Sequence, residues 1–417
     1  EDGRGRRHFT IAEQLIGAQG HNEIGYLPRP DEAVSWARQG LIHGATGLMF
    51  FRWRTADKGQ EVFCYGVQDC DNVPRRRFHE AKKVMAFGRR HAPILSAPVE
   101  ARVALVYTYD NVFAWQAQTQ SSAFNAEAET ARLYEPFWRF GVPIDVLNGM
   151  SDEILASIRS RAQYDVVVVP FPMVLPDALF EALEAHVKAG GSLYVGYRAD
   201  LRTEDMKIRP YSRLAKLAGV HIEEIESLNS GSAAVVEDNG GGGDSRDMVP
   251  RRRKRGQKGR SMDQPSEYQA RVWRDILAIA DPESTEALYR YRDFDGFAAV
   301  TRRRFEPAAA ANGSRTTKAA AGEVVYIGCG MPPEALLPAA RETLVRHGVI
   351  EEHELGDGGR AVVMSHSPTV EVMRRYDRAG RPWLFVTNFA EAPAALEVPC
   401  PRRSPAGGRG RRAGRRE

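Results

Sequence analysis

Glu13 is the residue of this sequence whose type and position are best suited to chemistry. The short apolar run 9–12 predicts a β-strand that stops at Glu13, and the loop that follows contains Gly17, Gly20 and Gly25. A carboxylate that ends a strand before such a loop is well placed to meet a substrate. The pattern also allows the commoner case of a surface glutamate in a loop.

A second group of side chains, Arg52-Trp53-Arg54, follows the apolar strand predicted over residues 48–51. The two guanidinium groups could pair with active-site carboxylates, and the Trp53 indole could stack on the apolar face of a sugar ring. The alternative is that the arginines pair with loop carboxylates and hold the rim of the fold. Glu61, in the next loop, could accept hydrogen bonds from sugar hydroxyls.

Residues 8–90 predict two β-loop-α units that would position these side chains. After Pro30-Asp31 the sequence predicts a helix whose apolar residues recur at helical spacing, namely Ala33, Val34, Trp36, Ala37 and Leu41. Residues 48–51 are apolar throughout, which is typical of a strand buried on both faces of a parallel sheet. A second helix is predicted over 75–88. Such units build (β/α)8 barrels. Because two units cannot close a barrel and leave an unpaired edge, the pattern favours a fragment.

Residues 100–350 alternate between strands and helices. The predicted strands cover 103–107, 143–147, 164–169, 192–196 and 323–327, and the predicted helices cover 126–140, 152–159, 176–188 and the segment after Pro332. This alternation predicts an α/β fold with a doubly wound parallel sheet.

Three further segments differ in composition. Residues 228–268 are rich in Gly, Ser, Asp and Arg and predict a disordered insertion. Residues 358–400 contain strand-like patterns that suit a small β-sandwich. The Arg-rich tail over 401–417 is predicted to be disordered.

The composition narrows the classes of partner and cofactor. The four cysteines among 417 residues, Cys64, Cys70, Cys329 and Cys400, are too scattered for a disulfide framework or a zinc cluster, so we expect reduced thiols in a cytoplasmic protein, without metal or cofactor. The net charge of +4 comes from local basic runs, which predict solvated loops; nucleic-acid binding through 251–258 is the alternative. No apolar stretch is long enough to span a membrane, so neither nucleic acid nor membrane is expected as a partner.

Several motifs around these residues resemble glycoside hydrolase family 42 β-galactosidases. The resemblance to the seventh barrel strand and its loop rests on Ile11-Ala12-Glu13-Gln14-Leu15, Gly17-Ala18-Gln19-Gly20, Asn22-Glu23-Ile24-Gly25 and Pro28-Arg29-Pro30. A longer block is also similar to this family, His43-Gly44-Ala45-Thr46-Gly47 running into Phe50-Phe51-Arg52-Trp53-Arg54-Thr55-Ala56.

The resemblance implies that Glu13 is the nucleophile of a retaining hydrolysis of terminal β-D-galactosides. Phe51 and Glu61 match positions that shape the galactose pocket, and we expect Arg52 and Trp53 to line or support it.

This sequence departs from the family's pattern at two sugar-facing positions. His21 stands where an aromatic residue, usually Trp, is expected, and Cys64 stands where His or Trp is typical. We therefore expect His21 and Cys64 to contact the substrate and to alter its choice.

The general acid/base of this family is the Glu of an Asn-Glu pair on the fourth barrel strand. No such strand precedes Glu13, and Asn22-Glu23 lies in the loop after strand seven, so it does not substitute. A nucleophile without an acid for the leaving group gives little or no turnover. We therefore expect residues 1–95 to be the C-terminal part of the barrel and the chain by itself to be inactive.

Residues 100–350 resemble the trimerisation domain of the same enzymes, a flavodoxin-like fold related to class I glutamine amidotransferases. The resemblance implies a homotrimer. Pro170-Phe171-Pro172 occupies the turn where an amidotransferase carries its cysteine, so that activity is excluded. The C-terminal stretch resembles the family's small β-sandwich. The main alternative to the enzyme is a non-catalytic oligomerisation or carbohydrate-binding protein.

Overall fold

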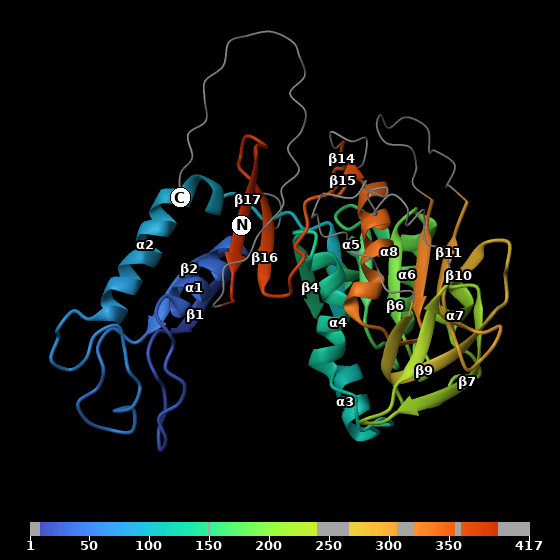
Figure 1. Ribbon diagram of the computed structural model, residues 1–417, viewed down its shortest axis with the longest axis horizontal. Coiled ribbons are helices and arrows are strands. Elements are labelled where there is room, and N and C mark those ends of the chain that lie inside the picture. The colour runs from blue at the N-terminus through green and yellow to red at the C-terminus, as the bar shows by residue number, and fades with distance from the viewer. Residues whose placement is uncertain (1–8, 149–150, 240–266, 307–320, 355–359, 391–417) are drawn as a thin grey trace, which may run out of the picture.

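The computed structural model describes residues 9–148, 151–239, 267–306, 321–354 and 360–390. These residues form a small N-terminal lobe and a larger lobe built on a broad sheet, with a β-hairpin between them (Figure 1). Among them, no helix combines the length and the apolar character needed to cross a membrane.

The N-terminal lobe consists of two βα units, as the sequence predicts. They are β1 (Phe9–Leu15), α1 (Glu32–Ile42), β2 (Ala45–Phe51) and α2 (Arg76–Leu95). β1 and β2 pair in parallel as a two-stranded sheet, and α1 packs against α2. The helix α1 buries Ala33, Val34, Ala37 and Ile42, so its apolar face is the predicted one.

Three local predictions for this lobe need correction. β1 does not stop at Glu13 but continues to Leu15. β2 is not buried on both faces, since Met49 is 54% exposed; the reason is that β1 is its sole neighbouring strand in the described part of the chain. The helix α2 passes through Gly88 to Leu95, because one glycine costs a helix only about 1 kcal/mol.

The larger lobe contains an eleven-stranded sheet. Its parallel part has the order β4-β3-β5-β6-β12 and consists of β3 (Val103–Tyr107), β4 (Ile144–Asn148), β5 (Val166–Val169), β6 (Ser192–Gly196) and β12 (Glu323–Ile327). This is the flavodoxin-like order 2-1-3-4-5. Every residue of β5, β6 and β12 is buried, as expected for central parallel strands covered on both faces.

Helices cover both faces of this sheet. α4 (Ala126–Trp138) and α8 (Pro333–Arg346) contribute to one apolar core. The other core takes residues from α5 (Asp152–Ser160), α6 (Asp177–Lys188) and α7 (Arg213–Leu217). A further helix, α3 (Tyr109–Ala117), lies between β3 and α4 in the chain. The sheet is therefore doubly wound, as predicted.

The sheet also has an antiparallel extension, which starts at β12 and which the sequence does not predict. It contains β7 (Val220–Leu228), β8 (Ala234–Asp238), β9 (Glu267–Ile279), β10 (Thr285–Tyr291), β11 (Ala298–Arg304) and β13 (Cys329–Gly330). The predicted insertion over 228–268 is consequently too wide, because Ala234 and Val236 are buried where β8 pairs with β9 and β10. Its remaining part, 240–266, lies outside the described residues.

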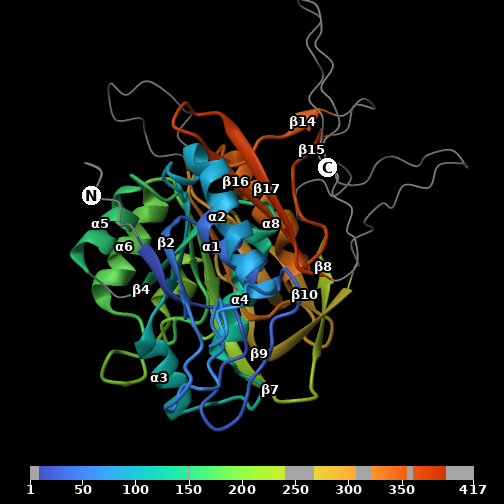
Figure 2. The same cartoon turned by 90° about the vertical axis from the view of Figure 1, so that its left-hand side faces the viewer.

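The C-terminal part contains two small antiparallel sheets. One pairs β14 (His353–Glu354) with β15 (Arg360–Ala361), and the other is the hairpin of β16 (Val370–Tyr376) and β17 (Pro382–Asn388). The hairpin lies within residues 358–400, for which the sequence predicts a small β-sandwich. The end of that segment and the tail over 401–417 lie outside the described residues. Figure 2 shows β16 and β17 beside α2, where Phe385 meets Phe87 edge-on.

Candidate active site at the ends of β1 and β2

Glu13 lies at an irregularity in the pairing of β1 with β2. Ile11 pairs with Leu48 and Gln14 pairs with Phe50, so Ala12 and Glu13 together face the single residue Met49. An extra residue of this kind is a β-bulge, which bends a strand and re-aims a side chain, and bulges are frequent next to active sites. The Glu13 side chain is exposed and is therefore accessible at the point where the strand is distorted.

The loops that follow β1 and β2 are joined by hydrogen bonds. Tyr65 N donates to Ala18 O at 2.9 Å. The side-chain amide of Gln19 donates to Phe51 O at 3.3 Å and to Tyr65 O at 3.2 Å. Gln19 thereby fixes the loop after Glu13 to the end of β2. Sequence reasoning missed this role, because the partner carbonyls lie 32 and 46 residues away and leave no local pattern.

Glycines permit this close approach. A Cβ atom at Gly17 would lie 2.5 Å from Tyr65 O, and one at Gly20 would lie 1.7 Å from Glu23 O. In the facing loop, a Cβ at Gly66 would lie 2.2 Å from Arg52 O. Backbone carbonyls cannot move aside as side chains can. Gly17 is therefore required by the packing of the two loops, whereas Gly20 and Gly66 are required by close turns within their own loops.

Arg52 pairs with a carboxylate of its own loop. Its Nη1 donates to Glu61 Oε2 at 2.9 Å, and the guanidinium carbon lies 5.5 Å from the centre of the Phe51 ring. Both partners are partly exposed, so in solvent the pair contributes at most about 1 kcal/mol. The structure thus shows the pairing with a loop carboxylate that the sequence left as an alternative. Within the loop after β2, a backbone bridge joins Arg54 to Gln68.

Trp53 offers an open aromatic surface beside this ion pair. The indole is 64% exposed, and the Phe78 ring meets it edge-on with the ring centres 6.3 Å apart. A partly exposed ring held from its side can still stack on a flat apolar ligand.

Cys64 and His21 differ in their surroundings. Cys64 is 5% exposed, and its thiol donates to Gly20 O at 3.4 Å, so it connects the two loops. His21, the next residue after Gly20, is exposed. Cys64, Cys70 and Cys329 are free cysteines. Within the described ranges, no three His, Cys, Asp or Glu side chains converge where they could hold a metal ion.

A cavity of about 560 Å³ lies elsewhere, at the carboxyl ends of β3, β4 and β5. Its carboxylates include Asp110, Asp152 and Asp177, each in the first turn of a helix. Acidic residues at this position stabilise the positive end of the helix dipole. We therefore assign these residues a structural role and place the candidate site at Glu13, not at the cavity.

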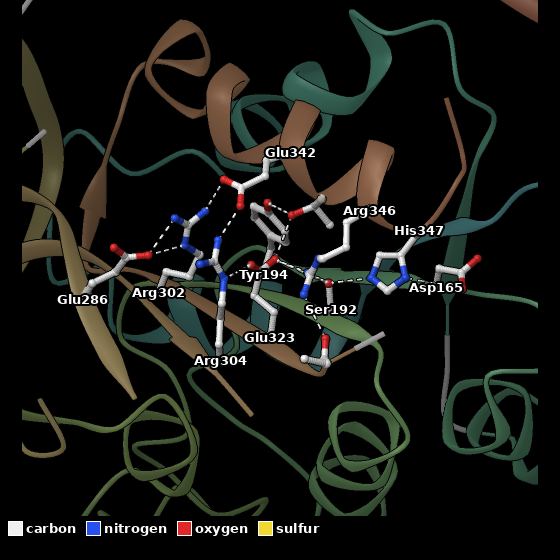
Figure 3. Close-up of polar contacts among 12 residues, drawn as sticks. Asp165, Ser192, Tyr194, Glu286, Arg302, Arg304, Glu323, Glu342, Arg346 and His347 are labelled. Atoms are coloured by element: carbon white, nitrogen blue, oxygen red, sulfur yellow. Dashed lines mark hydrogen bonds and ion pairs between the residues drawn. The ribbon is translucent and has the colours of Figure 1, made fainter. Parts of the chain in front are cut away.

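A buried serine, histidine and aspartate also lie in a row at the amino end of the parallel strands (Figure 3). Ser192 Oγ lies 2.9 Å from His347 Nε2, and His347 Nδ1 lies 3.7 Å from Asp165 Oδ1. This order is that of a hydrolase triad. However, Ser192 is 0% exposed, and its hydroxyl also accepts a hydrogen bond from Arg346 at 2.7 Å. Burial lowers the pKa of His347 to about 3, so it is a poor base. The row is structural.

Comparisons with known proteins agree with this architecture. The family model described as "Beta-galactosidase trimerisation domain" matches residues 101–355, and the model described as "Beta-galactosidase" matches residues 2–88. A β-galactosidase of Halorubrum lacusprofundi is 28% identical over 391 residues, which are 92% of this chain and 47% of that protein. One of Thermus thermophilus is 31% identical over 239 residues, 56% of this chain and 35% of that protein.

Solved structures show the same fold. The crystal structure of a β-galactosidase from Rahnella sp. R3 aligns with a TM-score of 0.70 at 19% identity, covering 93% of this chain and 50% of that one. The Halorubrum lacusprofundi enzyme aligns with a TM-score of 0.66 at 25% identity, covering 92% and 48%. Some curated relatives align with most of this chain, and the chain spans about half of their length. The chain belongs to glycoside hydrolase family 42, the β-galactosidases, and corresponds to the C-terminal part of its members.

Proposed function

We propose that the protein is part of a retaining β-galactosidase in which Glu13 is the nucleophile. The observation that carries this proposal is the exposed carboxylate of Glu13 at a bulge of β1, beside a loop that is fixed to the end of β2. In a retaining hydrolysis the carboxylate attacks the anomeric carbon, and the bond from that carbon to the leaving oxygen breaks. Water then hydrolyses the glycosyl ester, and the reaction requires no metal or cofactor.

The two loops would bind the galactose. The exposed face of Trp53 would stack on the sugar ring, and Phe51 would form part of the pocket wall. Glu61 has carboxylate oxygens left for sugar hydroxyls, since only its Oε2 is bonded to Arg52. His21 would reach the substrate from the loop after β1, and Cys64 would act from the loop after β2, where its thiol is hydrogen-bonded to Gly20 O.

The second carboxyl group of the reaction would come from outside the given sequence. A retaining enzyme needs an acid/base about 5–5.5 Å from its nucleophile. Asn22-Glu23 lies in the exposed loop after β1 and is not proposed for this role. The chain alone would therefore lack an acid for ordinary leaving groups and give little turnover.

The division of labour follows the three parts of the chain. Residues 1–95 would complete the catalytic barrel, residues 100–350 would hold three copies together as a homotrimer, and residues 358–400 would form the small C-terminal domain. We propose a small galactoside as the substrate and the cytoplasm as the location.

Covalent labelling tests the role of Glu13. A 2-deoxy-2-fluorogalactoside with a dinitrophenolate leaving group requires no acid, because dinitrophenolate departs without a proton, and its fluorine slows hydrolysis of the glycosyl ester. We expect one fluorogalactosyl group on the peptide that contains Glu13, measured by mass spectrometry. The experiment uses the product of the complete reading frame, so that any upstream barrel units are present.

Two variants make the result specific. Glu13→Gln should abolish the label, and the matched Glu23→Gln, changed in the loop that follows β1, should retain it. Labelling that persists in Glu13→Gln would refute the assignment. A trimer that binds galactose but is never labelled would favour the alternative, a non-catalytic carbohydrate-binding protein.

A further inference from the structure

Two arginines of the flavodoxin-like domain lack an acidic partner. Arg198 follows the carboxyl end of β6, and its Nε and Nη2 both donate to Gln120 Oε1, at 3.0 and 2.6 Å. Arg202 donates from Nη2 to Gln118 Oε1 at 2.7 Å and from Nη1 to Met206 O at 2.8 Å. Both are partly buried, and neither forms an ion pair with any described residue.

Other buried and partly buried arginines of this domain, such as Arg302 and Arg213, are neutralised. Arg213 pairs with both Asp177 and Asp200, and Arg302 pairs with both Glu286 and Glu342. A partly buried guanidinium without a carboxylate loses hydration without gaining an opposite charge in exchange. The glutamines are neutral acceptors, so they fix Arg198 and Arg202 without cancelling their charge.

The other groups around Arg198 do not supply a bidentate carboxylate contact to its guanidinium either. Its guanidinium lies over the Trp273 ring, 4.8 Å from the centre. Burial lowers the pKa of Arg198 and the charge of Arg202 does the same, whereas the buried Asp275 opposes them. Asp275 Oδ2 accepts from the backbone N of Arg198 and from Tyr326 OH, and Oδ1 accepts from Trp273 Nε1. It therefore offers no bidentate contact to the guanidinium.

The backbone here adopts costly conformations. Gln120, Arg198 and Met206 have φ values of 52°, 59° and 61°, and Val272, next to Trp273, has a φ of 72°. This left-handed region is rare for residues other than glycine, and for a β-branched residue such as valine it is a clear outlier. Such outliers cluster where a structure positions functional groups.

We infer that Arg198 and Arg202 together form a binding site for an oxyanion, a carboxylate or phosphate group, at the carboxyl end of β6. Nη1 of Arg198 and Nε of Arg202 donate to no described residue and are the groups available to the ligand. Carboxylates and phosphates are the partners that guanidinium groups bind best, and ligands of open α/β sheets bind beyond the carboxyl ends of the strands. This site is separate from Glu13 and does not depend on the proposed hydrolysis.

The oxyanion has two possible sources, a small molecule or an acidic side chain of a second copy. Titration with inorganic phosphate, followed by calorimetry at constant ionic strength, tests the first. We expect binding in the millimolar range that weakens at least tenfold in Arg198→Gln and in Arg202→Gln. Arg271→Gln is the matched control, because Arg271 also donates to a glutamine, Gln269, but is exposed.

Light scattering tests the second source. If phosphate does not bind but Arg202→Gln weakens self-association while Arg271→Gln does not, the oxyanion belongs to another copy. Arg198 packs over the buried Trp273 ring, so the second variant, Arg202→Gln, keeps the test valid if Arg198→Gln fails to fold. The inference is overturned if folded Arg202→Gln matches the unmodified protein in both phosphate binding and self-association.

Discussion

Glu371 Oε1 lies 2.7 Å from His43 Nε2, although 328 residues separate the two in the chain. The same carboxylate accepts hydrogen bonds from Gln39 Nε2 at 3.1 Å and from Trp138 Nε1 at 3.0 Å. Its partners come from the N-terminal lobe and from α4, and Glu371 itself belongs to β16. With 2% exposure, this carboxylate is the joint at which the three parts of the chain meet.

Glu371→Gln should destabilise the protein. Its amide group would face donors from His43 and Trp138, and breaking a buried charged interaction costs about 3–5 kcal/mol. We expect a loss of about 3 kcal/mol in the free energy of unfolding at pH 7, measured by urea denaturation. Glu181→Gln, a matched change at an exposed position of α6, should have an effect below about 0.5 kcal/mol. Equal losses of unfolding free energy in the two variants would contradict the role of Glu371 as the joint.

The same carboxylate predicts a dependence on pH. Burial by itself would raise the pKa of Glu371, but the hydrogen bonds and charge of His43, with those of Trp138 and Gln39, outweigh it and hold the pKa below its usual value. A lowered folded-state pKa gives stability that is present above the unfolded-state pKa, about 4.3, and is lost as the pH falls through the folded value. The difference between Glu371→Gln and the unmodified protein should therefore shrink below about pH 4. A stability difference between the two proteins that stays constant below about pH 4 would count against this role of the Glu371 carboxylate.

Arg375 holds the ends of two helices. It is 1% exposed and donates to the carbonyls of Ile42, Ile94 and Ala97, the latter two at 3.1 and 2.6 Å. Arg375→Met removes this donor from the carbonyls of Ile42 and Ala97, at about 1–3 kcal/mol for each buried group that is left unsatisfied, whereas Ile94 O still accepts from Ala97 N. We expect a clearly lower melting temperature and faster hydrogen exchange at the ends of α1 and α2. The neighbouring Arg374→Met should show neither; if it did, general loss of charge on β16 would be the cause.

Acid should destabilise the larger lobe through His186. This residue is 0% exposed, and burial lowers its pKa to about 4. Between pH 6.5 and 4 the unfolded chain takes up a proton that the folded protein refuses, so stability falls by up to about 3 kcal/mol as the pH drops. His186→Gln should reduce this slope in denaturation curves, and the exposed His221→Gln should leave it unchanged. His347 adds a slope of the same sign, so we expect a reduction and not abolition.

Gly20 should be intolerant of any side chain. In Gly20→Ala the new Cβ would meet Glu23 O at 1.7 Å, and the loop must move. Exchange of the amides of Gly25 and Tyr65, which donate to Gln19 O and Ala18 O, should accelerate. Gly88→Ala meets no atom within 4 Å and should stabilise α2 by up to about 1 kcal/mol. Unchanged exchange in Gly20→Ala would show that the loops are not packed as described.

The sequence predicts the parallel strands well and the antiparallel ones poorly, for a physical reason. Residues 166–169 and 192–196 are buried on both faces, so their apolar runs are unmistakable. In β7, by contrast, the exposed positions carry Glu223, Glu224 and Glu226, and no apolar run marks the strand. The strand over residues 234–238 is short and borders a glycine-rich segment. For this reason the predicted insertion includes these residues.

The candidate site, too, can be predicted from the sequence only in part. Residue types and motifs indicate Glu13, Arg52, Trp53 and Glu61, and the pairing of Arg52 with Glu61 was one of two alternatives. The bulge at Glu13 and the bridge made by Gln19 depend on register and on distant carbonyls. Neither has a local sequence pattern, and the same holds for Glu371.

The position of Glu371 in the chain also sets the order of assembly during synthesis. Domains form as units while the chain emerges from the ribosome, the N-terminal ones first. Every described strand and helix of the two lobes precedes β16 in the chain. The contacts of Glu371 with His43 and Trp138, and those of Arg375 with the ends of α1 and α2, can therefore form only after both lobes have been translated. A premature stop codon just before residue 370 would leave the described strands and helices of both lobes and remove the joint that Glu371 forms between them.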